Sequence, residues 1–172
     1  TTSSGTFTTV RTIPGADTST ANVTGLTTGE PYYFRICGYT TVSSGIVEGV
    51  LSSQVSCIPK PRIPTSFSLS YADYNSLLLS WNAVTNADGY EIYRSTSYKA
   101  STFVKISTVP NGGSSSYTYT DTGLTCGTRY YYRVISYVTN TMGDNVYSSY
   151  TSILSKAPMP MAPQNAQVVT ST

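Results

Sequence analysis

The chain of 172 residues contains no histidine. Histidine is the most common general acid–base group and metal ligand in proteins, so its absence argues against much of that chemistry. Three cysteines are too few for a zinc site made of cysteine alone. The eight carboxylates form no calcium-loop pattern; Asp88 and Glu91 are close in sequence, but they fit a turn residue and a solvated strand position. We therefore expect no catalytic residue, no metal and no cofactor.

Charge is also scarce, because only 10% of the residues are charged and the net charge is +2. The ten basic residues are scattered and form no stripe, so nucleic-acid binding is not expected. No apolar run reaches the 18 residues that suggest a transmembrane helix, so we expect no membrane span in this segment.

Hydroxyl-bearing and aromatic residues dominate instead, and they include sixteen tyrosines. With 39% hydrophobic residues, the chain can form a core. A surface that is polar through hydroxyl groups rather than charges is typical of proteins outside cells. Asn22 opens an Asn-Val-Thr triplet, a candidate N-glycosylation site. These features favour an extracellular or cell-surface location.

Two segments of the sequence recur at a spacing close to 98 residues. TFTTVRTIP at 6–14 resembles TFVKISTVP at 102–110, and GLTTGEPYYFR at 25–35 resembles GLTCGTRYYYR at 123–133. A period of this length corresponds to one small domain per repeat. We expect residues 1–60 to be the C-terminal half of one module and 61–158 a complete module. Residues 159–172 would be a linker and the first strand of a third.

Proline-rich stretches separate the copies, at 58–64 and 157–163. Such linkers are semi-rigid, so neighbouring modules should follow one another in a line. The first copy lacks three strands. Either the chain is part of a longer polypeptide, or neighbouring chains complete the sandwich by strand addition.

The middle copy contains seven short segments with alternating hydrophobicity and turn residues between them, which predicts an all-β sandwich. The expected strands are 67–71, 77–81, 90–94, 103–108, 116–120, 129–138 and 146–152. Alternation places one set of side chains in the core. That set is Leu69, Leu77, Leu79, Trp81, Tyr90, Ile92, Val104, Ile106, Tyr119, Leu124, Tyr130, Tyr132 and Val134.

The segment LSWNAVTNADGYEIYR, residues 79–94, resembles the second and third strands of fibronectin type III domains. The segment GLTCGTRYYYRV at 123–134 is similar to that family's turn into the sixth strand. The resemblance implies tandem immunoglobulin-like β-sandwiches with seven strands per module. It also implies a tyrosine corner, with Leu124 before Tyr130 in the middle copy and Leu26 before Tyr32 in the first. The family's Arg-Gly-Asp integrin motif is absent.

The cysteines leave several arrangements open. Cys37 and Cys57 fall in the sixth and seventh strands of the first copy, which are neighbours, so a disulfide within that copy is one candidate. Cys126 lies in a loop of the middle copy and is a candidate for an intermolecular bond. Three free thiols are the third arrangement.

Outward-facing tyrosines are the remaining candidates for binding. Tyr131, Tyr137, Tyr147 and Tyr150 should face outward on the sixth and seventh strands, where they either pair across strands or contact a carbohydrate or protein.

We therefore expect a non-catalytic spacer or filament unit of a long, extracellular, bacterial-type protein, with neighbouring modules or identical chains as partners. The alternative is an accessory module of a secreted polysaccharide-active enzyme or adhesin, with a carbohydrate or surface protein as its partner. No nucleic acid is expected as a partner.

Overall fold

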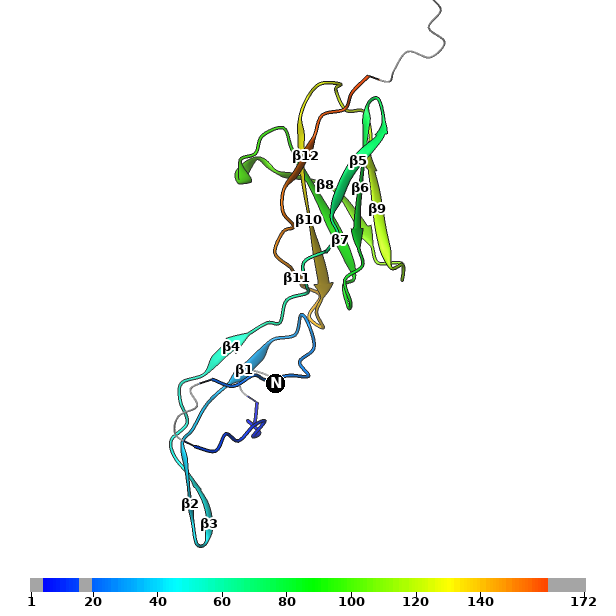
Figure 1. Cartoon of the computed structure of the whole chain (residues 1–172). Coiled ribbons are helices and arrows are strands. Elements are labelled where there is room, and N and C mark those ends of the chain that lie inside the picture. Colours follow the sequence, from blue (N-terminus) through cyan, green and yellow to red (C-terminus); the bar gives the residue numbers. More distant parts are fainter. Residues whose placement is uncertain (1–4, 16–19, 161–172) are drawn as a thin grey trace, which may run out of the picture. The chain divides into compact units, whose positions relative to one another are not determined.

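The computed structural model describes residues 5–15 and 20–160 (Figure 1). These residues form twelve β-strands and one short 3-10 helix, and they contain no α-helix. They divide into two compact units. The larger comprises Pro61–Val138 and the residues from Tyr147 onward, and the smaller comprises the residues up to Lys60 together with Thr139–Val146. The strand expected after Met159 lies outside the described residues.

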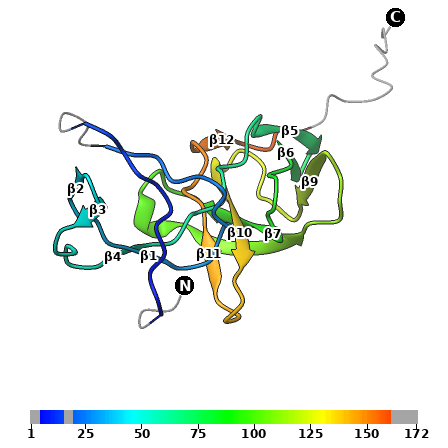
Figure 2. The ribbon, with the colours of Figure 1, turned by 90° about the horizontal axis from the view of Figure 1, so that it is seen from below.

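The larger unit is an immunoglobulin-like sandwich of two antiparallel sheets. The first sheet has the order β5-β6-β9, with β5 Ser68–Asp73, β6 Ser76–Asn82 and β9 Ser116–Asp121. The second has the order β11-β10-β7-β8, and β12 also pairs with β10. Its strands are β7 Gly89–Ser95, β8 Val104–Pro110, β10 Tyr130–Thr139, β11 Asn145–Tyr147 and β12 Leu154–Lys156. The 3-10 helix η1, Ala100–Thr102, connects β7 to β8. Figure 2 shows β5, β6 and β9 to one side of β7 and β10.

The core lies between these two sheets and is rich in aromatic rings. Trp81 on β6, Tyr90 on β7 and Tyr117 on β9 have ring centroids 4.9–6.4 Å apart. The Tyr90 hydroxyl also accepts a hydrogen bond from the Val84 amide at 2.8 Å. The side chains of Trp81, Tyr90, Ile92, Leu124, Tyr130 and Tyr132 are all buried there. Burying several large rings stabilises a module of this size.

Two expectations for the core were incomplete. Val104 is 61% exposed, because β8 is an edge strand and neighbouring protein does not cover that end. Tyr117 is buried although it was not expected in the core, and Tyr119, which was, is only half-buried. The alternation along β9 therefore does not by itself identify the residue that reaches the centre.

The expected seventh strand at 146–152 is interrupted. The chain pairs with β10 as β11 up to Tyr147 and again as β12 from Leu154. Between them the Ser148 and Thr151 amides still donate to the Ser136 and Val134 carbonyls at 2.9 Å. The Ser136 and Val134 amides, however, donate to Ser148 Oγ and Thr151 Oγ1, both at 3.0 Å, so side-chain hydroxyl groups replace one backbone acceptor in each pair.

The smaller unit contains two short antiparallel pairs. β1, Tyr32–Phe34, pairs with β4, Val55–Cys57, and β2, Tyr39–Val42, pairs with β3, Gly45–Glu48. Many apolar side chains are exposed in this unit, namely Ile36, Val42, Ile46, Val47, Val50, Leu51 and Val55. Its described residues therefore enclose no core comparable with that of the larger unit.

Candidate interaction surface

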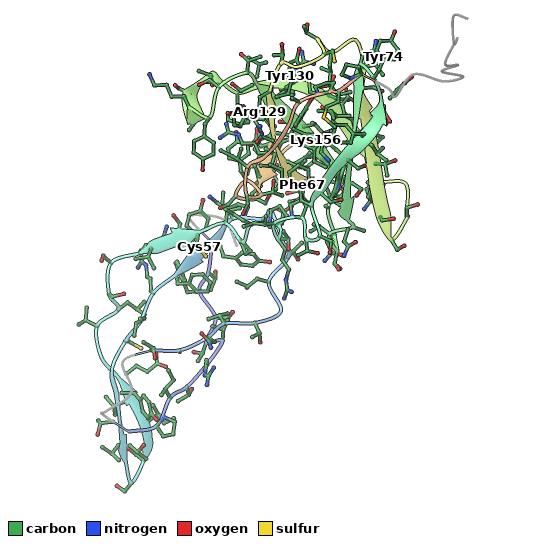
Figure 3. The ribbon with its side chains drawn as sticks, turned by 45° about the horizontal axis from the view of Figure 1, so that its top comes forward. Cys57, Phe67, Tyr74, Arg129, Tyr130 and Lys156 are labelled. Carbon is green, nitrogen blue, oxygen red and sulfur yellow. The ribbon has the colours of Figure 1, made fainter. Side chains whose placement is uncertain are left out.

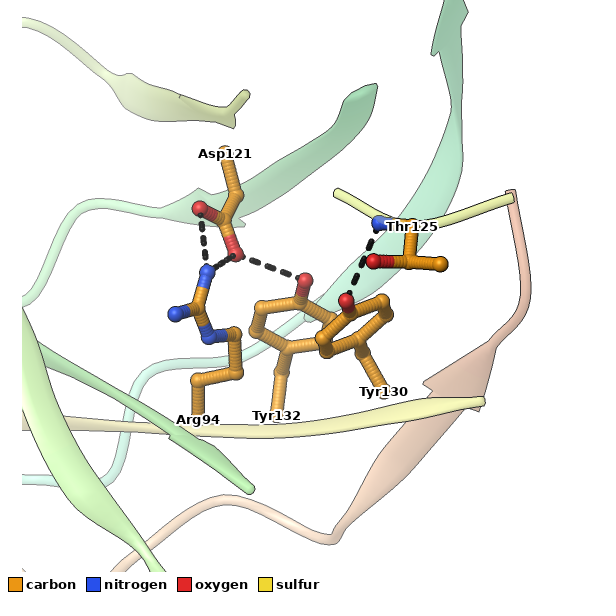
Figure 4. Close-up of polar contacts among 5 residues, drawn as sticks. All are labelled: Arg94, Asp121, Thr125, Tyr130 and Tyr132. Atoms are coloured by element: carbon orange, nitrogen blue, oxygen red, sulfur yellow. Dashed lines mark hydrogen bonds and ion pairs between the residues drawn. The ribbon is translucent and has the colours of Figure 1, made fainter. Parts of the chain in front are cut away.

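The turn into β10 is held by the expected corner tyrosine. The Tyr130 hydroxyl accepts a hydrogen bond from the Thr125 amide at 3.1 Å (Figure 4). Leu124, one residue earlier, is 5% exposed, and its amide donates to the Asn75 carbonyl at 2.8 Å. The corner thus fixes where the chain enters β10.

The same hydrogen bonds recur in the smaller unit. The Thr27 amide donates to the Tyr32 hydroxyl at 2.8 Å. The Gly29 amide donates to the Pro59 carbonyl at 2.8 Å, as the Gly127 amide does to the Pro158 carbonyl. Tyr32 and Leu26 are only half-buried, unlike their counterparts in the larger unit. The sequence repeat is therefore also a repeat of local backbone geometry.

A polar network connects the two sheets of the larger unit. Asp121 on β9 is 4% exposed. Its two carboxylate oxygens each lie 2.9 Å from Nη1 of Arg94 on β7, and the Tyr132 hydroxyl on β10 donates to Oδ2 at 2.7 Å (Figure 4). The carboxylate is paired with a cation and a phenol, which is what its burial requires. We interpret this network as structural, since it joins strands of opposite sheets.

The network perturbs the ionisation of two of its members. Burial, followed by the hydrogen bond to Asp121 and that residue's charge, raises the pKa of Tyr132. For Arg94, burial lowers the pKa, but the hydrogen bond and charge of Asp121 outweigh that effect, so the net pKa is raised. Both groups therefore keep their protons throughout the physiological range.

Arg133 is the centre of an aromatic cluster on the outer face of the second sheet. Its guanidinium carbon lies 3.6 Å from the ring centroid of Tyr150, 4.4 Å from that of Phe103 and 5.6 Å from that of Tyr93. Cations are attracted to aromatic ring faces at such distances. One nitrogen of the guanidinium donates to the Ala100 carbonyl at 3.5 Å, and the buried Nε has no hydrogen-bond partner.

Glu91 lies on the same face and is buried, which corrects the expectation of a solvated strand position. It is 4% exposed because long side chains from neighbouring strands cover it. Lys105 Nζ lies 2.9 Å from Oε1, and the Tyr93 hydroxyl donates to Oε2 at 2.7 Å. The hydroxyl of Tyr147 donates to Oε1 at 3.4 Å. Burial, then the hydrogen bond to Glu91, raises the pKa of Tyr93.

The outward tyrosines pack against one another rather than standing alone. Tyr98 and Tyr131 meet edge to face at 6.0 Å, Tyr93 and Tyr150 at 5.3 Å, and the Tyr137 and Tyr147 rings lie 6.1 Å apart. Tyr98 nevertheless remains 68% exposed. We use the term outer face for the side of β7, β8 and β10 that carries Arg133 and these rings.

Gly89 provides room for one of those rings. It faces Tyr137 across the strands, and a Cβ atom built there would lie 2.7 Å from the Tyr137 hydroxyl oxygen. The aromatic ring thus covers a glycine on the neighbouring strand. The sequence pattern did not reveal this contact, since it depends on the register between β7 and β10.

The structure does not bring Cys37 and Cys57 together. All three cysteines are free. Cys57 pairs with Tyr32, five residues from Cys37, and a strand rises about 3.3 Å per residue. Figure 3 labels Cys57, which is exposed, as is Cys126. The Cys126 thiol points to the Pro158 carbonyl oxygen at 3.4 Å.

The other candidate residues are placed as follows. Asn22 is exposed, and its backbone carbonyl accepts a hydrogen bond from Arg11 at 2.8 Å. No group of three or more metal-ligating side chains occurs within residues 5–15 and 20–160. In the same part of the chain, no helix has the length and apolar character needed to cross a membrane.

Known proteins resemble this chain over about one module. An alpha-amylase of Niallia circulans is 36% identical over 107 residues, which are 58% of this chain and 7% of that protein. A poly(3-hydroxybutyrate) depolymerase of Ralstonia pickettii is 35% identical over 94 residues, or 55% of this chain and 17% of that protein. A solved Fn3-like protein from Clostridium thermocellum is 31% identical, with 60% of this chain and 98% of that chain covered and a TM-score of 0.43. No family model matches the sequence.

Proposed function

We propose that this chain, which belongs to the fibronectin type III family, is a non-catalytic accessory segment of a longer, secreted polymer-degrading protein. The observation that carries the proposal is the size of the matches to curated proteins. They extend over 107 and 94 residues, close to the 98-residue repeat, and cover only 7% and 17% of the two enzymes. The resemblance is thus to a module that long enzymes contain.

The interactions that stabilise the larger unit support a role as a spacer. Its two sheets are tied together by the aromatic core and by the Arg94–Asp121 ion pair, and Tyr130 fixes one corner. We propose that residues 61–158 are a complete module and residues 1–60 the second half of a preceding one. Residues 159–172 would begin a third, so that tandem sandwiches separate functional domains at a set distance.

Isolation and assay of the intact protein test this proposal. The intact protein would be isolated from its source with an antibody against the 172-residue chain, sequenced by mass spectrometry, and assayed on starch and on poly(3-hydroxybutyrate). We expect a longer polypeptide that hydrolyses a polymer, whereas the 172-residue chain alone is inactive. A polypeptide made only of further copies of the module would contradict the accessory role.

A structural filament or surface stalk is the second candidate. It is favoured by the recurrence of the corner hydrogen bonds at a spacing of 98 residues, at Tyr32 and again at Tyr130. Electron microscopy of native material, with and without reductant, tests this candidate. Ordered filaments that are lost in reductant would favour it and would implicate the exposed Cys126.

A further inference from the structure

We propose that the outer face of β7, β8 and β10 binds a carboxylate-bearing polysaccharide. This inference rests on the proposed accessory role and names the chemical class of the partner. The proposed elements of the site are Arg133 and Arg129 as the charged groups, and Tyr98 and Tyr131 as the sugar contacts.

The side chains on this face carry an excess of positive charge. Arg129, Tyr131 and Arg133 occupy alternate positions along β10 and its entry, so their side chains lie on one face of the sheet. The only carboxylate among the side chains placed on this face is that of Glu91, and Lys105 neutralises it at 2.9 Å. The two arginines are thus not balanced by acidic groups there, which favours an anionic partner.

Neighbouring aromatic rings hold the guanidinium of Arg133 in a fixed position. Three aromatic rings surround its guanidinium, and its single hydrogen bond, to the Ala100 carbonyl, is long at 3.5 Å. Of the five N–H donors of a guanidinium, the one on the buried Nε is out of reach of a ligand, so those on the two terminal nitrogens are the ones that can bind. Because a fixed guanidinium matches the two oxygens of a carboxylate, this arrangement favours a carboxylate ligand.

The tyrosines supply the second element of the site. Tyr98 is 68% exposed and packs edge to face on Tyr131, with ring centroids 6.0 Å apart. A tyrosine combines an apolar ring with a polar hydroxyl, and a pyranose ring likewise combines an apolar C–H face with hydroxyl groups. Arg129 lies beside them, with Nη1 3.3 Å from Ser155 Oγ. A sugar on Tyr98 and Tyr131 would therefore have a cation on either side.

The place of these side chains in the sheet favours a polysaccharide over a peptide. Peptides that bind sheets commonly add a strand at a free edge. Here the residues concerned centre on β10, which is paired on both sides, with β7 and with β11 and β12. The partner must therefore lie across side chains and not along the backbone, as a flat sugar chain can.

Affinity electrophoresis and calorimetry of the 172-residue chain test the inference with three probes, namely polygalacturonate, soluble starch and poly-L-glutamate. We expect binding to polygalacturonate at low salt, weaker binding as salt increases, and no comparable binding to the other two. Arg129→Gln and Tyr98→Ala, both at exposed positions, should each weaken binding about tenfold, the effect of losing one contact of roughly 1.4 kcal/mol. Arg133→Gln should abolish it, with the fold checked by circular dichroism.

Arg62→Gln and Tyr74→Ala are matched controls, because they change exposed residues of the same types outside the outer face. Equal weakening by these controls would overturn the inference. So would tighter binding to poly-L-glutamate, which would indicate an acidic protein partner, or an absence of binding to polygalacturonate. These failures would leave the accessory role intact, because that role is tested on the intact protein by its length and activity.

Discussion

Ile36 and Val134 make the same backbone hydrogen bonds 98 residues apart, yet Ile36 is 75% exposed and Val134 is 0% exposed. The Ile36 amide donates to Ser52 Oγ and the Val134 amide to Thr151 Oγ1, each at 3.0 Å. Their carbonyls accept from the Ser52 and Thr151 amides. In the larger unit, β5, β6 and β9 cover the inner face on which Val134 lies. Among the described residues of the smaller unit, no such sheet covers Ile36.

This contrast predicts unequal effects of truncating the two side chains. Val134→Ala should lower the free energy of unfolding of the larger unit by about 2 kcal/mol, because it leaves a cavity in the core. Ile36→Ala should change stability by less than about 0.5 kcal/mol, the usual effect at exposed positions. Urea denaturation followed by circular dichroism measures both. A large effect of Ile36→Ala would show that another element covers it in solution.

The two tyrosine corners should also differ in how much they contribute to stability. Tyr130→Phe removes the hydrogen bond from the Thr125 amide and should cost about 1 kcal/mol. Tyr32→Phe removes the equivalent bond from the Thr27 amide, but Tyr32 is only half-buried, so we expect a smaller loss. Thermal unfolding of both variants measures the difference, and equal losses would contradict this explanation.

Alkaline pH should destabilise the larger unit through Tyr132. In the unfolded chain this phenol titrates near its ordinary pKa of 10.0, whereas burial and Asp121 raise its pKa in the folded chain. The contribution of the protonated Tyr132 phenol to stability is complete below pH 10. It is lost as the pH rises above 10, because the unfolded chain then releases the phenol proton while the folded chain retains it. Each such group contributes at most about 1.4 kcal/mol per pH unit.

Denaturation at pH 8 and at pH 11 tests this expectation. Tyr132→Phe should reduce the pH dependence of stability above pH 10, although it lowers stability at pH 8 by removing the bond to Asp121. Tyr74→Phe, at an exposed turn, is the control and should leave the pH dependence unchanged. An unchanged pH dependence in Tyr132→Phe would show that other groups control alkaline unfolding.

Thiol titration should find three reactive cysteines. The strand register separates Cys37 from Cys57, and Cys57 and Cys126 are exposed. We expect the unfolded, unreduced chain to react with three equivalents of a thiol reagent, and its mass to remain the same after reduction. A mass increase of about 2 Da on reduction would reveal a disulfide, and one between Cys37 and Cys57 would require a different register between β1 and β4.

A larger side chain at Gly89 should displace the Tyr137 ring. Gly89→Ala places a Cβ atom against the Tyr137 ring and should destabilise the larger unit by about 1–3 kcal/mol. Tyr137→Ala in the same chain should recover part of that loss, because it removes the clash. A double-mutant cycle in urea measures the coupling, and strictly additive effects would show that the ring does not limit this site.

The sequence by itself determined most strands of the larger unit, the corners and the repeat, because these features depend on local signals. Alternating apolar residues specify which side of a strand is buried, and GLT before a tyrosine marks the corner at Tyr130. Such patterns identified Trp81, Tyr90 and Tyr132 as buried residues. The matching residues of the first copy predicted a second corner at Tyr32.

Only the tertiary structure decided which polar and aromatic groups come together. The ion pair between Arg94 and Asp121 joins opposite sheets, and the rings around Arg133 come from β7, a loop and the segment after β11. Their distances depend on strand register and on how the sheets pack, which local patterns do not encode. The burial of Glu91 and the exposure of Val104 have the same origin, since burial depends on what the rest of the fold places over a residue.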